Sequence, residues 1–266
     1  MEFSKKVYLS ATALMIGAIG FAQNNTSTIK QDGSTNTATT TQWGSTNNNT
    51  ATVDQLGNGN FSRIDQETDT ELSNATLIQS GDSHRSKIEQ RGPETNATVE
   101  QIGFKNKSVI RQRDDIEKSD ADVFQNGNKN KSNIRMASGI ENQVFVDQVG
   151  DNHVSAINNA YGFASTTTIN QNGLGGHKSS SQQFKSNSSD ITVTQSGDDL
   201  FNESSVRQEL GESNSTLVNQ NGSGHLNTVL QNGDFHEATV TQNGARQTST
   251  LNQFGNNNIA TVTQGN

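Results

Sequence analysis

The sequence contains no cysteine, a single proline and few apolar residues. Hydrophobic types make up 28% of its 266 residues and aromatics 5%. Without cysteine, disulfides cannot stabilise an exported chain. An ordinary oil-like core is also excluded, because it needs a larger hydrophobic fraction. Stability must therefore come from the abundant Gly, Asn, Gln, Ser and Thr, a composition that alone is compatible with either disorder or an ordered repeat.

The N-terminal stretch has the pattern of a secretory signal peptide. Lys5 and Lys6 precede an apolar run from Val7 to Phe21 that ends in small residues. This predicts a signal peptide over residues 1–22, cleaved after Ala22, and the run is too short for a stable membrane span. We therefore expect a secreted, extracellular protein with no membrane span. Residues 23–30 form its short N-terminal segment and residues 31–266 its repeats.

Glutamine recurs along the mature chain with a step of 11 to 13 residues. The glutamines are Gln31, Gln42, Gln55, Gln66, Gln79, Gln90, Gln101, Gln112, Gln125, Gln148, Gln171, Gln183, Gln195, Gln208, Gln220, Gln231, Gln242, Gln253 and Gln264, with Met136 and Asn159 in two expected places. Before each glutamine, every second residue belongs to a narrow class: aliphatic two before, small four before, and amide, hydroxyl or imidazole six before. Asparagines in this last slot include Asn36, Asn60, Asn106, Asn130, Asn202 and Asn258. A period of two predicts strands with one buried face.

The predicted strands alternate between two kinds. The first kind has serine at the small position and leans to isoleucine at the aliphatic one, whereas the second has alanine and leans to valine. The serines are Ser62, Ser86, Ser108, Ser132, Ser155, Ser179, Ser204 and Ser249, and the alanines are Ala51, Ala75, Ala97, Ala121, Ala238 and Ala260. The structural unit is therefore a pair of strands with a period of 22 to 25 residues.

Glycine marks one of the two corners of each pair. It follows two residues after the glutamine of every second strand, at Gly33, Gly57, Gly81, Gly103, Gly127, Gly150, Gly173, Gly197, Gly222 and Gly244. Glycine supplies the backbone freedom that a tight corner needs. We expect an all-β fold, a β-solenoid of about ten two-strand coils with two facing parallel sheets, rising roughly 48 Å. Its interior would hold stacked amide ladders and a dry core, as in cross-β structures.

The spacing of the polar residues resembles the curlin repeat. It is carried by Gln31-x4-Asn36-x5-Gln42, Gln55-x4-Asn60-x5-Gln66, Gln101-x4-Asn106-x5-Gln112 and Gln253-x4-Asn258-x5-Gln264. Curlins are subunits of curli, the functional amyloid fibres on the surfaces of Gram-negative bacteria. The resemblance implies export through an outer-membrane secretion pore, nucleation on a minor subunit, and growth of a homopolymer by end-to-end addition. This chain differs in having about twice as many coils and an irregular middle over residues 136–185.

No residue pattern points to an enzyme, a metal or a cofactor. His84, His153, His177, His225 and His236 all occupy the polar slot six residues before the repeat position. A ladder position explains every one of them. The acidic residues are scattered and not clustered as a catalytic site requires. We therefore expect a non-enzymatic protein with no cofactor and no specific nucleic-acid recognition.

An alternative function is a monomeric ice-binding or adhesive solenoid. Threonines form a column at the outward position three before glutamine, at Thr52, Thr76, Thr98, Thr168, Thr192, Thr239 and Thr261. Threonine favours strands in any case, and Asp122, Phe145 and Leu217 interrupt the column. A flat ice-matching face would need two uninterrupted columns, so fibre assembly remains the favoured function.

Two surface features are expected to serve assembly. The strand edge of the last coil, which includes Val240 and Val262, would offer unpaired backbone groups to the next molecule. The first-kind sheet would carry a basic face, made of Arg63, Arg85, Lys87, Lys107, Arg111, Lys131, Arg135, Lys178 and Arg207. On the second-kind sheet we expect acidic residues and no basic one. The basic face would dock on the acidic face of another fibre or on matrix polyanions.

Overall fold

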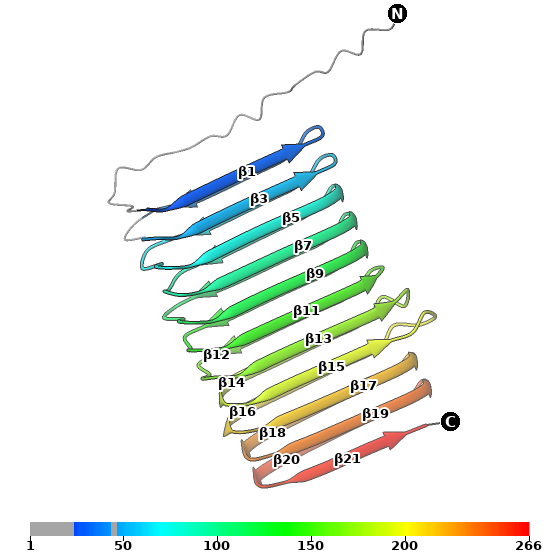
Figure 1. Ribbon diagram of the computed structural model, residues 1–266. Coiled ribbons are helices and arrows are strands. Elements are labelled where there is room, and N and C mark those ends of the chain that lie inside the picture. The colour runs from blue at the N-terminus through cyan, green and yellow to red at the C-terminus, as the bar shows by residue number, and fades with distance from the viewer. Residues whose placement is uncertain (1–23, 44–46, 266) are drawn as a thin grey trace, which may run out of the picture.

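The computed structural model describes residues 24–43 and 47–265. All of the secondary-structure elements within these residues are β-strands. The expected signal peptide lies outside the described residues. Within them, no helix is long and apolar enough to cross a membrane. Figure 1 shows the strands stacked as successive coils of one solenoid, with the N-terminal coil at one end and the C-terminal coil at the other.

Two parallel sheets make up the solenoid. The first, called here the odd sheet, has 11 strands: β1 Thr26–Asp32, β3 Thr50–Leu56, β5 Asn74–Asp82, β7 Asn96–Phe104, β9 Asp120–Asn128, β11 Gln143–Gly150, β13 Thr166–Gly173, β15 Asp190–Ser196, β17 Ser215–Ser223, β19 Glu237–Ala245 and β21 Ile259–Gln264. The second, called the even sheet, has 10: β2 Thr37–Gln42, β4 Phe61–Gln66, β6 Arg85–Gln90, β8 Lys107–Arg113, β10 Lys131–Ala137, β12 Val154–Ala160, β14 Lys178–Asn187, β16 Glu203–Glu212, β18 Leu226–Asp234 and β20 Thr248–Asn256. The expected two-sheet β-solenoid is confirmed.

Neighbouring strands pair in parallel with equivalent residues opposite each other. Gln31 lies opposite Gln55, and Gln55 lies opposite Gln79. A slip of one residue would turn every buried side chain outward, so the alternating pattern fixes this register. Strand β1 already begins at Thr26 and pairs along its length with β3. The solenoid therefore includes part of the segment that we expected to precede it, because Ser27 and Ile29 continue the alternation.

The two sheets interlock with an offset of half a strand spacing. Gln55 Nε2 on β3 donates to Ser62 Oγ on β4 at 2.9 Å, and Ser62 Oγ donates to Gln79 Oε1 on β5 at 2.8 Å. The same bridge recurs from the other side, where Thr216 on β17 joins Gln208 and Gln231 of the even sheet. Each strand therefore lies, along the axis, midway between two strands of the facing sheet.

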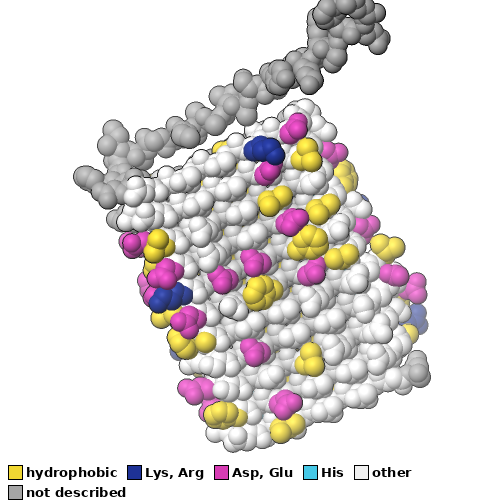
Figure 2. All heavy atoms as spheres, in the orientation of Figure 1, with side chains coloured by type: hydrophobic (Ala, Val, Ile, Leu, Met, Phe, Trp, Pro, Cys, Tyr) yellow, Lys and Arg dark blue, Asp and Glu magenta, His cyan; other side chains and the backbone are white. Residues whose placement is uncertain are grey.

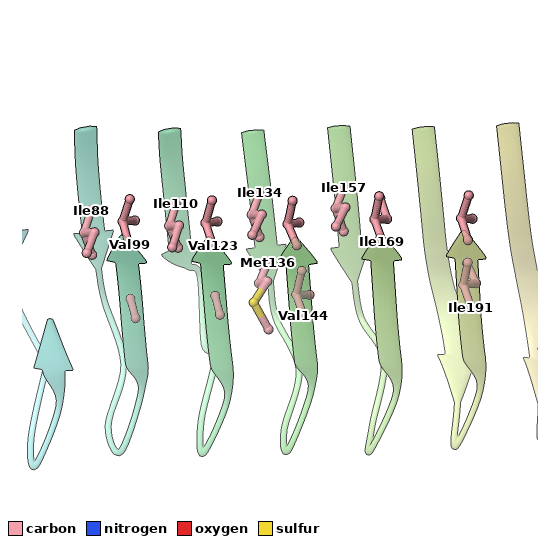
Figure 3. Close-up of a cluster of buried hydrophobic side chains, with 14 of the residues drawn as sticks. Ile88, Val99, Ile110, Val123, Ile134, Met136, Val144, Ile157, Ile169 and Ile191 are labelled. Carbon is pink, nitrogen blue, oxygen red and sulfur yellow. The ribbon is translucent and has the colours of Figure 1, made fainter. Parts of the chain in front are cut away.

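The apolar core is a narrow double column. Figure 3 shows Ile88, Ile110, Ile134 and Ile157 of the even sheet following one another along the axis, with Val99 and Val123 of the odd sheet beside them. These side chains are at most 3% exposed. In most strands, alanine or serine lies on one side of the aliphatic residue and glutamine lies on the other. Hydrogen-bonded glutamine amides therefore complete the interior. This explains how so polar a chain has a dry core.

Candidate functional site

The odd sheet contains an unbroken glutamine ladder. Each Nε2 donates to the Oε1 of the next coil at 2.6–2.9 Å, from Gln31 to Gln264. Its members are Gln31, Gln55, Gln79, Gln101, Gln125, Gln148, Gln171, Gln195, Gln220, Gln242 and Gln264. Every bond points the same way along the axis. The ladder is therefore directional, with an acceptor at the β1 edge and a donor at the β21 edge.

The even sheet has the same ladder with one break. It runs from Gln42 to Gln112, and again from Asn159 to Gln253. Met136 fills the rung between the two halves and is fully buried. A thioether cannot replace an amide donor, and Asn159 Oδ1, which faces this rung, is buried without a partner among the described residues. The amide ladder of the even sheet is therefore interrupted at Met136.

At the corner after each odd strand, asparagine and histidine make equivalent contacts. Asn60 accepts the backbone N–H of His84 at its Oδ1 (2.9 Å) and donates from Nδ2 to the Gly81 carbonyl (2.8 Å). His84 in turn accepts the N–H of Asn106 at Nδ1 (3.2 Å) and contacts the Ser80 carbonyl through Nε2 (3.2 Å). An acceptor at Nδ1 and a donor at Nε2 assign the proton to Nε2.

This corner ladder continues with the same logic to the last coil. His177 donates its N–H to Nδ1 of His153 at 3.1 Å, Asn202 donates to Nδ1 of His177 at 3.1 Å, and Gln247 donates to Nδ1 of His225 at 3.3 Å. A proton on Nδ1 of His153 or His177 would face a backbone N–H, so the geometry at these two residues requires neutral imidazoles.

Burial lowers the pKa of His84, His153 and His177 below the usual histidine value. Desolvation is the largest cause in each case, because the charged form loses its water. At His177 the neighbouring His153 lowers the pKa further, and the two rings stack with centroids 5.1 Å apart. Asp151 and Asp198 nearby oppose the shift without reversing it.

The opposite corner has its own ladder, in which hydroxyls often replace amides. Asn49 Oδ1 accepts the N–H of Ser73 at 2.9 Å, and Ser73 Oγ accepts the N–H of Thr95 at 3.0 Å. Ser119 Oγ accepts the N–H of Asn142 at 3.1 Å. These residues occupy the slot six residues before the repeat position, in which the sequence predicts an amide, a hydroxyl or an imidazole.

The ten predicted corner glycines all have a positive φ, as the tight corner requires. A side chain at these positions is excluded by lack of space as well as by backbone strain. A Cβ on Gly81 would lie 2.0 Å from the Gly103 carbonyl oxygen, and one on Gly103 would lie 2.3 Å from that of Gly127. Close stacking of the corners therefore depends on glycine in every coil.

Sequence comparison identifies the repeat. The family model described as the Curlin associated repeat matches residues 22–57, 46–70, 211–244 and 237–265. The chain therefore contains four curlin repeats. A comparison with curated protein sequences finds no match. The matched curlin repeats lie toward the two ends of the solenoid, and the glutamine ladder of the odd sheet continues through the coils between them.

The even sheet carries the predicted basic side chains together with three acidic residues expected at outward positions, Asp65, Glu89 and Glu203. Asp65 and Glu89 are only 1% and 5% exposed, although they occupy outward positions. Arg63 and Lys87 pair with Asp65, whereas Lys87 and Arg111 pair with Glu89. Part of the predicted basic face is therefore neutralised. Of the predicted basic face, the residues with no ion pair within residues 24–43 and 47–265 are Arg85, Lys107, Lys131, Arg135 and Lys178.

The outer face of the odd sheet carries mainly uncharged side chains, and most of its charged side chains are acidic. Figure 2 looks onto this face and shows acidic side chains scattered over a mostly uncharged surface. The expectation that it holds no basic residue is wrong, because Lys30 on β1 lies there and pairs with Asp54 at 3.3 Å. No group of three or more His, Asp or Glu that could hold a metal ion occurs in the described parts of the chain.

Both ends of the described solenoid present unpaired strand edges. In the described structure β1 pairs only with β3 and β2 only with β4, while β20 pairs only with β18 and β21 only with β19. The corner ladders end there too. Gln247 Oε1 is buried without a partner in the described chain, whereas the equivalent atoms of earlier rungs accept an N–H from the next coil.

Proposed function

We propose that this protein is a secreted structural subunit that assembles end to end into extracellular amyloid fibres of the curli type. The observation that carries the proposal is the directional pairing at the two edges. The β21 edge ends the glutamine ladder with a donor, Gln264 Nε2, and the β1 edge begins it with an acceptor, Gln31 Oε1. A second copy supplies the missing partner at each edge, and unprotected strand edges favour such pairing.

The curlin repeat supports this assignment, because curlins are fibre subunits. An outer-membrane secretion pore, a nucleating minor subunit and a role in biofilm matrix and surface adhesion belong to the same proposal. The unpaired basic residues of the even sheet support a further partner, a matrix polyanion bound without sequence recognition.

A monomeric ice-binding or adhesive solenoid is the second candidate. Its supporting observation is that Thr52 and Thr76 lie opposite each other on neighbouring odd strands, as do Thr168 and Thr192. A thermal-hysteresis assay on the monomer distinguishes the two functions. Ice-binding activity without fibres would favour the second candidate.

The experiment for fibre assembly uses the mature protein, residues 23–266, left at neutral pH. We expect thin unbranched fibres by electron microscopy, amyloid-dye binding and cross-β diffraction near 4.8 Å and about 10 Å. Replacing Val240 and Val262 with proline removes an N–H and core packing from each of β19 and β21, the last two odd strands. The variant should assemble at least about tenfold more slowly, because its edge cannot template another strand.

The matched control is Val240→Ala with Val262→Ala, which retains both N–H groups and loses only side-chain volume. It should assemble faster than the proline variant. Growth of the proline variant at the parental rate would show that fibres do not extend through this edge.

A further inference from the structure

The first coil departs from the rule that distinguishes the two sheets. The small buried position is serine along most of the even sheet and most often alanine along the odd sheet, yet β1 of the odd sheet has Ser27 and β2 of the even sheet has Ala38. Ser27 lies opposite Ala51, and Ala38 lies opposite Ser62. The first coil therefore has the two kinds of strand exchanged relative to the coils that follow.

The exchanged strands match the far end of the solenoid. Strand β1 reads TSTIKQ up to its glutamine and β20 reads TSTLNQ, with four of six residues identical. Strand β2 reads TATTTQ and β21 reads IATVTQ, again with four of six identical. Strand β1 of the odd sheet thus resembles β20 of the even sheet, and β2 of the even sheet resembles β21 of the odd sheet.

The strand numbers lead independently to the same pairing. The solenoid begins and ends in the odd sheet, with 11 strands there against 10 in the even sheet. Since the sheets are offset by half a strand spacing, the next free position beyond β21 lies on the even side, directly next to β20. If a second copy were stacked without rotation, its β1 would follow β21 and that even position would stay empty. Its β2 would then lie roughly 9.6 Å from β20, twice the strand spacing and too far for backbone hydrogen bonds.

We propose that successive subunits in the fibre are related by a half-turn about the fibre axis, so that β1 of one copy continues the even sheet after β20 and β2 continues the odd sheet after β21. This inference rests on the proposed end-to-end assembly. It places Ser27 on Ser249, Ile29 on Leu251 and Ala38 on Ala260, each in the register that neighbouring coils use.

One of the corner ladders is also continued by this arrangement. The half-turn brings the first corner of the incoming copy over Asn258, whose Oδ1 has no partner in the described chain. The backbone N–H of Asn36, which also lacks a partner in those residues, then meets an acceptor.

The arrangement is tested by disulfide trapping, because the chain has no cysteine of its own. Thr28, Thr250 and Thr261 are exposed, outward-facing residues of β1, β20 and β21. With the half-turn, Thr28→Cys of one copy lies about 4.8 Å from Thr250→Cys of the next, within the Cα range of a disulfide. Without it, Thr28→Cys lies beside Thr261→Cys instead. Within a single chain these positions lie at opposite ends.

Both double variants are assembled, checked for fibres by electron microscopy, oxidised, dissolved and run on a non-reducing gel. We expect a ladder of covalent multimers for Thr28→Cys/Thr250→Cys and monomers for Thr28→Cys/Thr261→Cys. The opposite result would overturn the half-turn and leave end-to-end assembly intact. Fibres with neither cross-link would overturn the half-turn as well. Failure of the parent protein to form fibres would instead refute the proposed function.

Fibres of the unchanged protein give a second test that does not depend on a variant folding. Eleven and ten strands per subunit advance the fibre by about 50 Å, so a half-turn at each joint gives a true repeat of about 100 Å. Unrotated stacking gives a repeat of about 53 Å. Layer lines at orders of about 100 Å are expected in fibre diffraction or electron-microscope transforms, and a repeat of about 53 Å alone would contradict the proposal.

Discussion

At the scale of the residue, asparagine and histidine are interchangeable at the corner because each places an acceptor and a donor at similar distances. Asn60 and His84 hold the same stacked backbone with different chemical groups. They differ in one property, since an imidazole can gain a proton near neutral pH and an amide cannot. Histidine therefore makes the stability of a corner depend on pH.

The sign of this dependence follows from the lowered pKa of His84, His153 and His177. The unfolded chain takes up protons below about pH 6.5, before the folded chain does. The stabilisation is therefore present above the unfolded pKa and is lost as pH falls toward the folded one. Burial raises the pKa of Asp122 and Asp147, so these carboxyls favour the fold at lower pH and act in the opposite direction.

Replacing His153 and His177 with asparagine should flatten the loss of stability between pH 7 and pH 5. The free energy of unfolding at neutral pH should change by less than about 1 kcal/mol, because asparagine restores both ladder bonds. Urea titrations of the monomer at several pH values measure both quantities. An acid response identical to that of the parent would show that these two histidines do not cause the loss of stability.

At the scale of the element, each strand is specified by its ladder partners more than by its own propensity. Met136 shows this most clearly, because a buried thioether separates two runs of amides in the even sheet. Replacing Met136 with glutamine would give the unpartnered Asn159 Oδ1 a donor and reconnect the runs.

We expect Met136→Gln to be neutral or stabilising by about 1 kcal/mol, since regained hydrogen bonds offset the lost apolar burial. The matched control is Gln112→Met in the adjacent intact rung, which should cost about 2 kcal/mol because it removes the amide that accepts from Gln90 Nε2 and donates to the carbonyls of Asn96 and Ser119. Urea unfolding of the monomers measures both changes. Equal destabilisation by the two substitutions would show that the amide ladder contributes little.

The strands, their pairing and the corner glycines could be predicted because they depend on a short repeated pattern. The burial of Asp65 and Glu89 could not, because it depends on which long basic side chains fold over them from neighbouring coils. The exchanged strands of the first coil were visible as residues, but their meaning depends on the half-spacing offset of the sheets.

At the scale of the whole molecule, the half-turn changes how charge is distributed on a fibre. Each side of the fibre would show the even sheet of one subunit and the odd sheet of the next, so basic and acidic blocks alternate every 50 Å or so. Two fibres shifted by one subunit can then match opposite charges along their whole length. A polyanion would meet a basic block on either side.

Arg85, Lys107 and Lys131 lie opposite one another on β6, β8 and β10, and with Arg135 they form a cluster free of ion pairs in the described residues. Replacing these four with glutamine should weaken binding of fibres to mixed-sequence double-stranded DNA at least tenfold at 0.1 M salt. Counterion release predicts that the slope of log affinity against log salt becomes shallower by about 3 to 4, since each contact contributes roughly 0.9. Lys87 and Arg111 are left in place, because removing them would uncover Asp65 and Glu89.

The control variant makes the same change in net charge on the odd sheet. In it, glutamate replaces Thr76, Thr168, Thr194 and Thr241. Both variants change the net charge by the same four negative units, so a general electrostatic effect would weaken both equally. We expect the odd-sheet variant to keep the parental salt slope, because DNA contacts the basic cluster of the even sheet and not the face that was altered. Fibre growth, followed by electron microscopy, should be unchanged in both, since the substituted side chains point outward from strands away from the two edges. Parental DNA affinity in the four-glutamine variant would show that this cluster does not bind polyanions.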